Sequence, residues 1–129
     1  MPSHILKYNF YHVPEHLPFE QAALLEPLAC AVHGSDRIPA KVGDTVAVIG
    51  AGPIGLMFMK LLSLKGCRVI AVDLSDYRLE QSEKFGVWKT VNASGEEHIK
   101  QVRDLCGGKG ADVVVEATGF PEVLSLIHI

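Results

Sequence analysis

The chain has 129 residues, of which 48% are hydrophobic, and its formal net charge at pH 7 is −3. This length and composition suit one domain with a buried core. Because the 12 Lys and Arg residues are scattered among 15 acidic ones, the chain lacks the clustered basic footprint of a nucleic-acid-binding protein. The longest apolar stretch, residues 46–59, is interrupted by glycines and stops at Lys60, so it is too short to cross a bilayer.

The cysteines and the amino terminus indicate a reducing compartment. Cys30, Cys67 and Cys106 form no Cys-x-x-Cys pair, and an odd count does not suit a disulfide framework. Residues 1–7 have no basic region followed by an apolar one, so no signal peptide is predicted. We therefore predict a cytoplasmic protein with three buried free thiols.

The first third of the chain predicts irregular structure followed by helices. Residues 1–17, which include Tyr8 and Phe10, are interpreted as irregular or edge-strand structure. Residues 18–33 have a helical pattern, but a proline disfavours the α region for the residue before it. We therefore predict two short helices with a break at residues 25–27, and Gly34 as the helix stop.

From residue 42 the pattern changes to strand, helix and strand. An apolar strand ends at Ile49, and a helix follows at once. The second strand, residues 68–72, runs into Asp73, and Gly66 ends the helix before it. Helical spacing predicts one buried face of this helix. Its members are Ile54, Met57, Phe58, Leu61 and Leu62.

The second half continues the alternation. Ser75 is predicted to cap a helix that reaches Phe85. Residues 88–92 are predicted to form a short third strand. Ser94 and Glu97 have the spacing of a capping box. The next helix is predicted to bury one face and to end at a Gly-Gly pair, before a fourth strand at residues 111–116. That buried face consists of Ile99, Val102, Leu105 and Cys106. Alternating strands and helices predict an α/β protein with a parallel sheet covered on both faces.

The most informative motif is Gly50-x-Gly52-x-x-Gly55, placed directly between the first strand and its helix. Glycines at these positions let the backbone turn tightly and approach a pyrophosphate, and the helix amino terminus supplies N–H groups and positive dipole. The alternative is that they are only turn glycines. Because a strand precedes the motif, a helix follows it and an acid ends the next strand, we predict a Rossmann-type dinucleotide site.

Asp73 is the candidate acceptor for both ribose hydroxyl protons of the dinucleotide. The alternative is a helix-capping acid, since Ser75 follows closely. A carboxylate there predicts NAD rather than NADP, because a 2′-phosphate would meet like charge. Arg78 is the nearby cation that would soften this repulsion, and we interpret it as a solvated helix residue lying near the adenine.

Two further places remain open from the residues alone. Ala117 and Thr118 follow the fourth strand, at the sheet edge where ligands of such folds bind. They are interpreted either as nucleotide contacts or as a strand-end turn. Glu26 is an acid inside an apolar stretch, and burial would require a cation, a hydrogen-bond donor or a metal. The alternative for Glu26 is a solvated residue at a helix end.

With these motifs in place, the chain resembles the medium-chain dehydrogenase/reductase family, most of all its zinc-dependent alcohol and polyol (sorbitol-type) dehydrogenases. The likeness covers nearly the whole chain, up to about residue 124. It rests on residues 13–17 (VPEHL), 22–29 (AALLEPLA), 41–46 (KVGDTV), 50–56 (GAGPIGL) and 110–119 (GADVVVEATG).

The resemblance implies hydride transfer from an alcohol or polyol to NAD, with zinc lowering the pKa of the substrate hydroxyl. It places Glu26 beside the catalytic zinc. It assigns the pyrophosphate to Gly50, Gly52, Pro53, Ile54 and Gly55, and the ribose to Asp73. Residues 1–34 would be the end of a catalytic domain with its connecting helices, and residues 35–129 part of an NAD-binding domain. A homo-oligomer is expected for the full-length protein, as in the family.

The chain also departs from the family. It has neither a Gly-His-Glu motif nor a four-cysteine lobe, and residues 126–129 do not continue the family pattern. We therefore expect a truncated fragment with about four of six strands, inactive as a dehydrogenase by itself. Two alternatives are a dinucleotide-binding module or remnant without chemistry, and a zinc-free, NADP-linked relative of quinone reductases. Asp73 disfavours the second.

Overall fold

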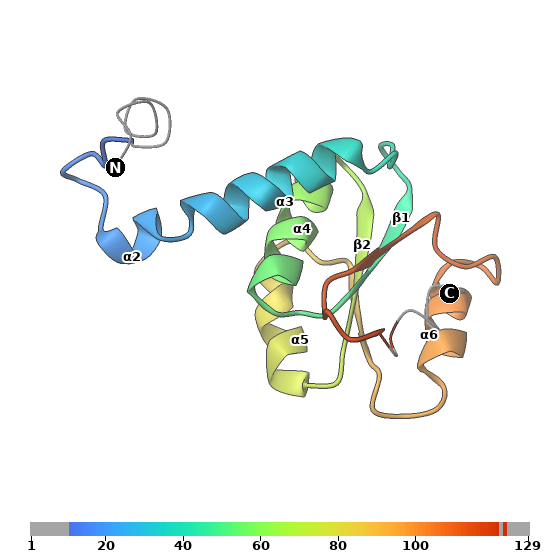
Figure 1. Cartoon of the computed structure of the whole chain (residues 1–129). Coiled ribbons are helices and arrows are strands. Elements are labelled where there is room, and N and C mark those ends of the chain that lie inside the picture. The colour runs from blue at the N-terminus through green and yellow to red at the C-terminus, as the bar shows by residue number, and fades with distance from the viewer. Residues whose placement is uncertain (1–10, 122, 124–129) are drawn as a thin grey trace.

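The computed structural model describes residues 11–121 and residue 123 (Figure 1). The expectations for Tyr8, for Phe10 and for residues 126–129 fall outside this part of the chain. The elements follow in the order α2 (Phe19–Ala22), α3 (Leu25–Arg37), β1 (Thr45–Ile49), α4 (Pro53–Leu64), β2 (Arg68–Asp73), α5 (Asp76–Glu83), β3 (Lys89–Asn92), α6 (His98–Leu105) and β4 (Val113–Glu116).

The four strands form one parallel sheet in the order β3-β2-β1-β4. β1 lies inside the sheet, where Ile49 is opposite Val72 of β2 and Glu116 of β4. All five residues of β1 are buried. A strand covered on both faces needs apolar side chains on both, which explains its continuous apolar run. The predicted α/β class with a Rossmann-type parallel sheet is confirmed.

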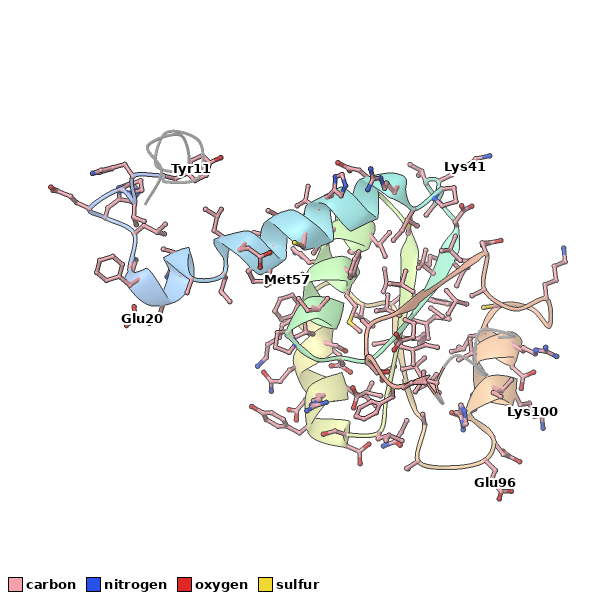
Figure 2. All side chains as sticks on the ribbon, viewed as in Figure 1. Tyr11, Glu20, Lys41, Met57, Glu96 and Lys100 are labelled. Carbon is pink, nitrogen blue, oxygen red and sulfur yellow. The ribbon has the colours of Figure 1, made fainter. Side chains whose placement is uncertain are left out.

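Two hydrophobic clusters cover the two faces of the sheet. Successive strand residues point to opposite faces, so Val46 and Val48 pack with α4 and α5, whereas Ala47 and Ile49 pack with α6. Figure 1 shows the same arrangement, with α4 and α5 on one side and α6 on the other. In Figure 2, Lys100 projects from α6 away from the sheet. Helices therefore cover both faces of the sheet, and the carboxyl ends of its parallel strands lie at one edge.

The buried stripe of α4 differs from the predicted one. Its fully buried residues are Gly55, Met59 and Leu62, whereas Ile54 is 40% exposed. The other predicted members, Met57, Phe58 and Leu61, are half-buried. The reason is that α4 packs on two partners: Met59 and Leu62 meet the sheet cluster, and α3 covers another side. In a helix that is apolar around most of its circumference, the sequence pattern does not indicate which side is buried.

The prediction that helix α3 begins after Pro27 and stops at Gly34 is wrong. α3 starts at Leu25 and runs through both residues to Arg37. A proline in the first turn removes only an N–H that has no helical partner, so it is tolerated there. Gly34 instead allows close packing, because a Cβ on it would lie 2.9 Å from Cζ of Phe58. Two helices are present as predicted, but the break is at residues 23–24.

The two predicted helix caps have opposite outcomes. Ser75 caps α5 as predicted, since its hydroxyl accepts the Arg78 N–H at 3.4 Å. The Ser94–Glu97 capping box is wrong. α6 begins at His98, and its N-cap residue, Glu97, makes no side-chain hydrogen bond to the helix. The Ser94 N–H instead donates to Asn92 Oδ1 at 2.8 Å. Asn92 thus holds a turn after β3, and the helix starts beyond it.

The segment before the sheet extends away from it. In Figure 1, α2 and the first half of α3 project from the body that the sheet and its helices form, and Figure 2 places Tyr11 and Glu20 far from the sheet. Several large apolar side chains of this segment are exposed, namely Phe19, Leu24, Leu25 and Leu28. Within residues 11–121 and 123, none of the helices has the length and apolar character needed to span a membrane.

Candidate functional site

A cleft of about 910 Å³ opens where the carboxyl ends of the strands meet. Of the residues predicted to bind a dinucleotide, all except Gly55 line it. Those are Gly50, Gly52, Pro53, Ile54, Asp73, Arg78, Ala117 and Thr118. They come from the β1–α4 loop, the end of β2, the start of α5 and the end of β4. The fold therefore brings the predicted residues together from across the sequence.

The three glycines of the motif each have a different physical reason. Gly50 has φ +100°, and a Cβ on it would lie 2.8 Å from Thr118 Cγ2. Apart from Gly52 itself and its two neighbours in the chain, no protein atom lies within 4 Å of the place that a Cβ on Gly52 would take, so that space is open to a ligand. A Cβ on Gly55 would lie 1.8 Å from the carbonyl oxygen of Gly50. These are the roles of tight turn, ligand approach and helix–strand packing in a dinucleotide loop.

The amino end of α4 faces this loop. Gly52 is its N-cap and Pro53 occupies the first turn, so no side chain caps the helix. Unpaired N–H groups and the helix dipole make such an end attractive to an anion. The open space at Gly52 and the helix end together fit a pyrophosphate.

Asp73 is built into the wall of the cleft. It is 8% exposed. Its Oδ2 accepts the Ala51 N–H at 2.7 Å, and its Oδ1 accepts the Ser75 N–H at 2.9 Å. A carboxylate oxygen has two acceptor positions, so each oxygen keeps one for a ligand. The position suits a pair of neighbouring hydroxyl groups, and the Ala51 contact ties the carboxylate to the glycine loop.

Arg78 lies beside Asp73 at the mouth of the cleft. Its guanidinium nitrogen is 3.9 Å from Asp73 Oδ2, and its side chain is 59% exposed. Arg78 is therefore a solvated helix residue, as interpreted from the sequence, and also a residue of the cleft.

The sequence patterns did not predict the part of the cleft that the loop after β3, the start of α6 and the segment after β4 supply. Ala93, His98, Phe120 and Val123 line it. His98 Nδ1 lies 2.6 Å from the Gly95 carbonyl oxygen, while its Nε2 is buried without a hydrogen-bond partner. One signal was present, because the first residue of a helix that follows a parallel strand lies near the carboxyl edge of the sheet.

Glu26 is not among the residues that line the cleft. It is exposed in the first turn of α3, where its Oε1 accepts the Cys30 thiol at 3.1 Å. This hydrogen bond raises the pKa of Cys30. The prediction of three buried thiols is wrong for exposed Cys30 and is met by Cys67, while Cys106 is partly buried. Among residues 11–121 and 123, no group of three or more His, Cys, Asp or Glu side chains could hold a metal ion.

Glu116 organises the end of β4 beside the cleft. One of its carboxylate oxygens accepts hydrogen bonds from the hydroxyl and the N–H of Thr118 and from the N–H of Gly119. These bonds, the Thr118 hydroxyl foremost, hold the pKa of Glu116 below its usual value. Ala117 and Thr118 belong to a strand-end turn, and both line the cleft; contact with a nucleotide stays a prediction.

Together, the parallel sheet, the glycine loop and the acid at the end of β2 define an α/β domain of the dinucleotide-binding class. The profile of the family described as "Zinc-binding dehydrogenase" matches residues 53–127. The chain belongs to this family.

Similarity to individual proteins extends over most of the chain. It is 38% identical over 123 residues to an erythritol/L-threitol dehydrogenase of Mycolicibacterium smegmatis, covering 92% of this chain and 34% of that protein. A zinc-dependent alcohol dehydrogenase 2 of Streptococcus pneumoniae superposes with a TM-score of 0.80 at 36% identity, covering 92% of this chain and 34% of that one. An alcohol dehydrogenase of E. coli, solved with its cofactor NADH, gives a TM-score of 0.75 at 28% identity, with 88% and 34% covered. The chain thus spans about one third of the length of these relatives.

Proposed function

We propose that this chain is the nucleotide-binding part of an NAD-dependent, zinc-containing oxidoreductase that acts on the CH–OH group of alcohols or polyols. One observation carries the proposal: the buried carboxylate of Asp73 is hydrogen-bonded to the glycine loop at Ala51 within the cleft. An acid joined to such a loop is the arrangement that binds the ribose and pyrophosphate of NAD.

Each part of NAD has a counterpart in the cleft. The pyrophosphate would lie at Gly52 and the amino end of α4, where no side chain occupies the space. The two hydroxyls of the adenosine ribose would donate to Asp73, and Arg78 would lie near the adenine. The nicotinamide half would extend toward Ala117 and Thr118, because β4 lies on the other side of β1 from β2.

Bound NAD supplies a hydride acceptor, and a zinc ion supplies a Lewis acid for the alcohol oxygen. The contribution of this chain to the reaction is to bind and orient the dinucleotide. Glu26 would offer one oxygen ligand to zinc. Because the described residues hold no group of three or more possible metal ligands, they do not fit a complete zinc site.

The segment before the sheet supports the proposed division of the chain into two parts, although α3 continues across residue 34 to Arg37. Phe19, Leu24, Leu25 and Leu28 expose apolar side chains, as expected for a segment that packs against further protein. We propose that residues 1–34 belong with a catalytic domain and residues 35–129 with the NAD-binding domain. Alcohols or polyols as substrates and a homo-oligomeric full-length protein are part of the same proposal.

The first test is a titration of the chain with NADH and with NADPH, followed by the fluorescence of the reduced nicotinamide. We expect NADH to bind, and NADPH to bind at least about tenfold more weakly, because the 2′-phosphate would meet the Asp73 carboxylate. Equal affinity for the two would contradict the assigned role of Asp73. If neither nucleotide binds, the proposed function fails.

A second test concerns chemistry. The chain by itself is expected to give no turnover of erythritol or sorbitol with NAD and zinc, since its described residues hold no catalytic metal cluster. Measurable turnover would refute this.

Sequencing the source DNA on both sides of the reading frame is expected to reveal the Gly-His-Glu motif upstream. Stop codons on both sides would instead favour a dinucleotide-binding module without chemistry.

A further inference from the structure

The turn after β4 is closed around a single carboxylate oxygen. Glu116 Oε1 accepts the Thr118 N–H at 2.5 Å, the Gly119 N–H at 3.1 Å and the Thr118 hydroxyl. The Thr118 hydroxyl oxygen in turn accepts the Phe120 N–H at 3.1 Å. Gly119 has φ +74°, a conformation that glycine adopts without steric cost. The end of β4 thus has one defined shape, and Glu116 holds it.

This network determines which part of Thr118 faces the dinucleotide loop. Its only hydroxyl proton is donated to Glu116, so the hydroxyl has no proton left for a ligand. Its methyl group faces Gly50, with Cγ2 lying 2.8 Å from the place that a Cβ on Gly50 would take. Thr118 therefore presents its methyl group and its backbone, and not a hydroxyl donor, to the glycine loop.

The order of the strands assigns this surface to one half of the dinucleotide. β1 and its glycine loop lie between β2 and β4. With the pyrophosphate at the loop and the adenosine ribose on Asp73 at the end of β2, the nicotinamide half extends over the end of β4. Ala117 and Thr118 line the cleft at that end.

We propose that Glu116 is a positioning residue for the nicotinamide half of NAD, acting through the Thr118–Gly119 turn. This inference rests on the proposed function. Without the carboxylate, two N–H groups and one hydroxyl lose their shared charged acceptor, and such charge-assisted hydrogen bonds are the strong ones. Binding of the nicotinamide half would then have to order the Thr118–Gly119 turn, and the entropy cost of that ordering weakens binding. Hydride transfer depends on such fixed placement of the ring.

The experiment compares NADH with ADP, which carries the adenosine and both phosphates but no nicotinamide. In Glu116→Ala, we expect the affinity for NADH to fall by about tenfold, while the affinity for ADP stays within about twofold of wild type. Glu116→Gln keeps an acceptor oxygen and is expected to restore most of the NADH affinity. A general structural defect would lower both affinities alike. Equal losses, or an unchanged affinity for NADH, would overturn the inference.

Asp112 provides a matched control. Its Oδ2 accepts the Thr45 N–H at 2.7 Å at the opposite end of β1 and β4, so Asp112→Ala removes a comparable acceptor far from the cleft. We expect the ratio of NADH to ADP affinity to stay at the wild-type value in this variant. If wild type binds neither nucleotide, the proposed function fails and this inference falls with it. If wild type binds both and Glu116→Ala leaves the ratio unchanged, only the inference fails.

Discussion

Replacing Gly55 by alanine is expected to lower the free energy of unfolding by about 3 kcal/mol or more. The added Cβ would lie 1.8 Å from the carbonyl oxygen of Gly50 and 2.9 Å from its carbonyl carbon. Gly50 cannot retreat easily, because its N–H donates to the Val72 carbonyl at 2.7 Å. α4 would have to move off β1 and open the core at Met59 and Leu62. Urea denaturation followed by far-UV circular dichroism measures the loss.

Gly52→Ala is the control for the Gly55 substitution. Beyond its two neighbours in the chain, no other residue has an atom within 4 Å of the place that its Cβ would take, and its φ of −75° suits any residue. We expect a cost in stability of about 1 kcal/mol or less, from the less favourable N-cap. Affinity for NADH should nevertheless fall at least about tenfold, because the methyl group enters the space proposed for the pyrophosphate. Equal stability of the two variants would contradict the packing role assigned to Gly55.

Replacing Asp73 by serine is expected to weaken NADH binding by roughly 10- to 100-fold, since hydrogen bonds to a charged acceptor contribute about 1.5–3 kcal/mol. Affinity for NADPH should fall much less or rise. In the wild-type chain the exposed guanidinium of Arg78 lies 3.9 Å from the Asp73 carboxylate. The substitution removes this negative charge, so that Arg78 can pair with the 2′-phosphate. The preference for NADH over NADPH would shrink or invert. Titration of the variant with both nucleotides measures it.

Asp76→Ser separates this local effect from a general change of charge. Asp76 is exposed at the start of α5 and does not line the cleft. The same loss of charge there should leave the NADH to NADPH ratio unchanged. Because Asp73 also holds the Ala51 N–H, Asp73→Ser should in addition lower stability by about 1–3 kcal/mol. Thermal unfolding checks that the titrated protein is folded. A similar shift in both variants would count against ribose recognition by Asp73.

Local signals in the sequence predicted the elements from residue 42 onward and most of the candidate cleft. β1 and β2 read directly as strands, because a strand buried on both faces needs a continuous apolar run. The glycine motif and Asp73 follow the ends of these strands. In a parallel sheet those ends share one edge, so their meeting in one cleft was predictable without coordinates.

Contacts between distant residues decided the rest. α3 continues through Gly34 because the glycine lets Phe58 of α4 approach, a contact between residues far apart in the chain. His98 enters the cleft only because α6 packs on the second face of the sheet.

The sequence by itself thus determined the order of strands and helices, the dinucleotide loop and the acid beside it, since each depends on neighbouring residues. The tertiary structure alone decided which side of α4 is buried, which part of Thr118 faces Gly50 and which far segments complete the cleft. Side-chain packing and hydrogen bonds across the fold set these features, and no local pattern encodes them.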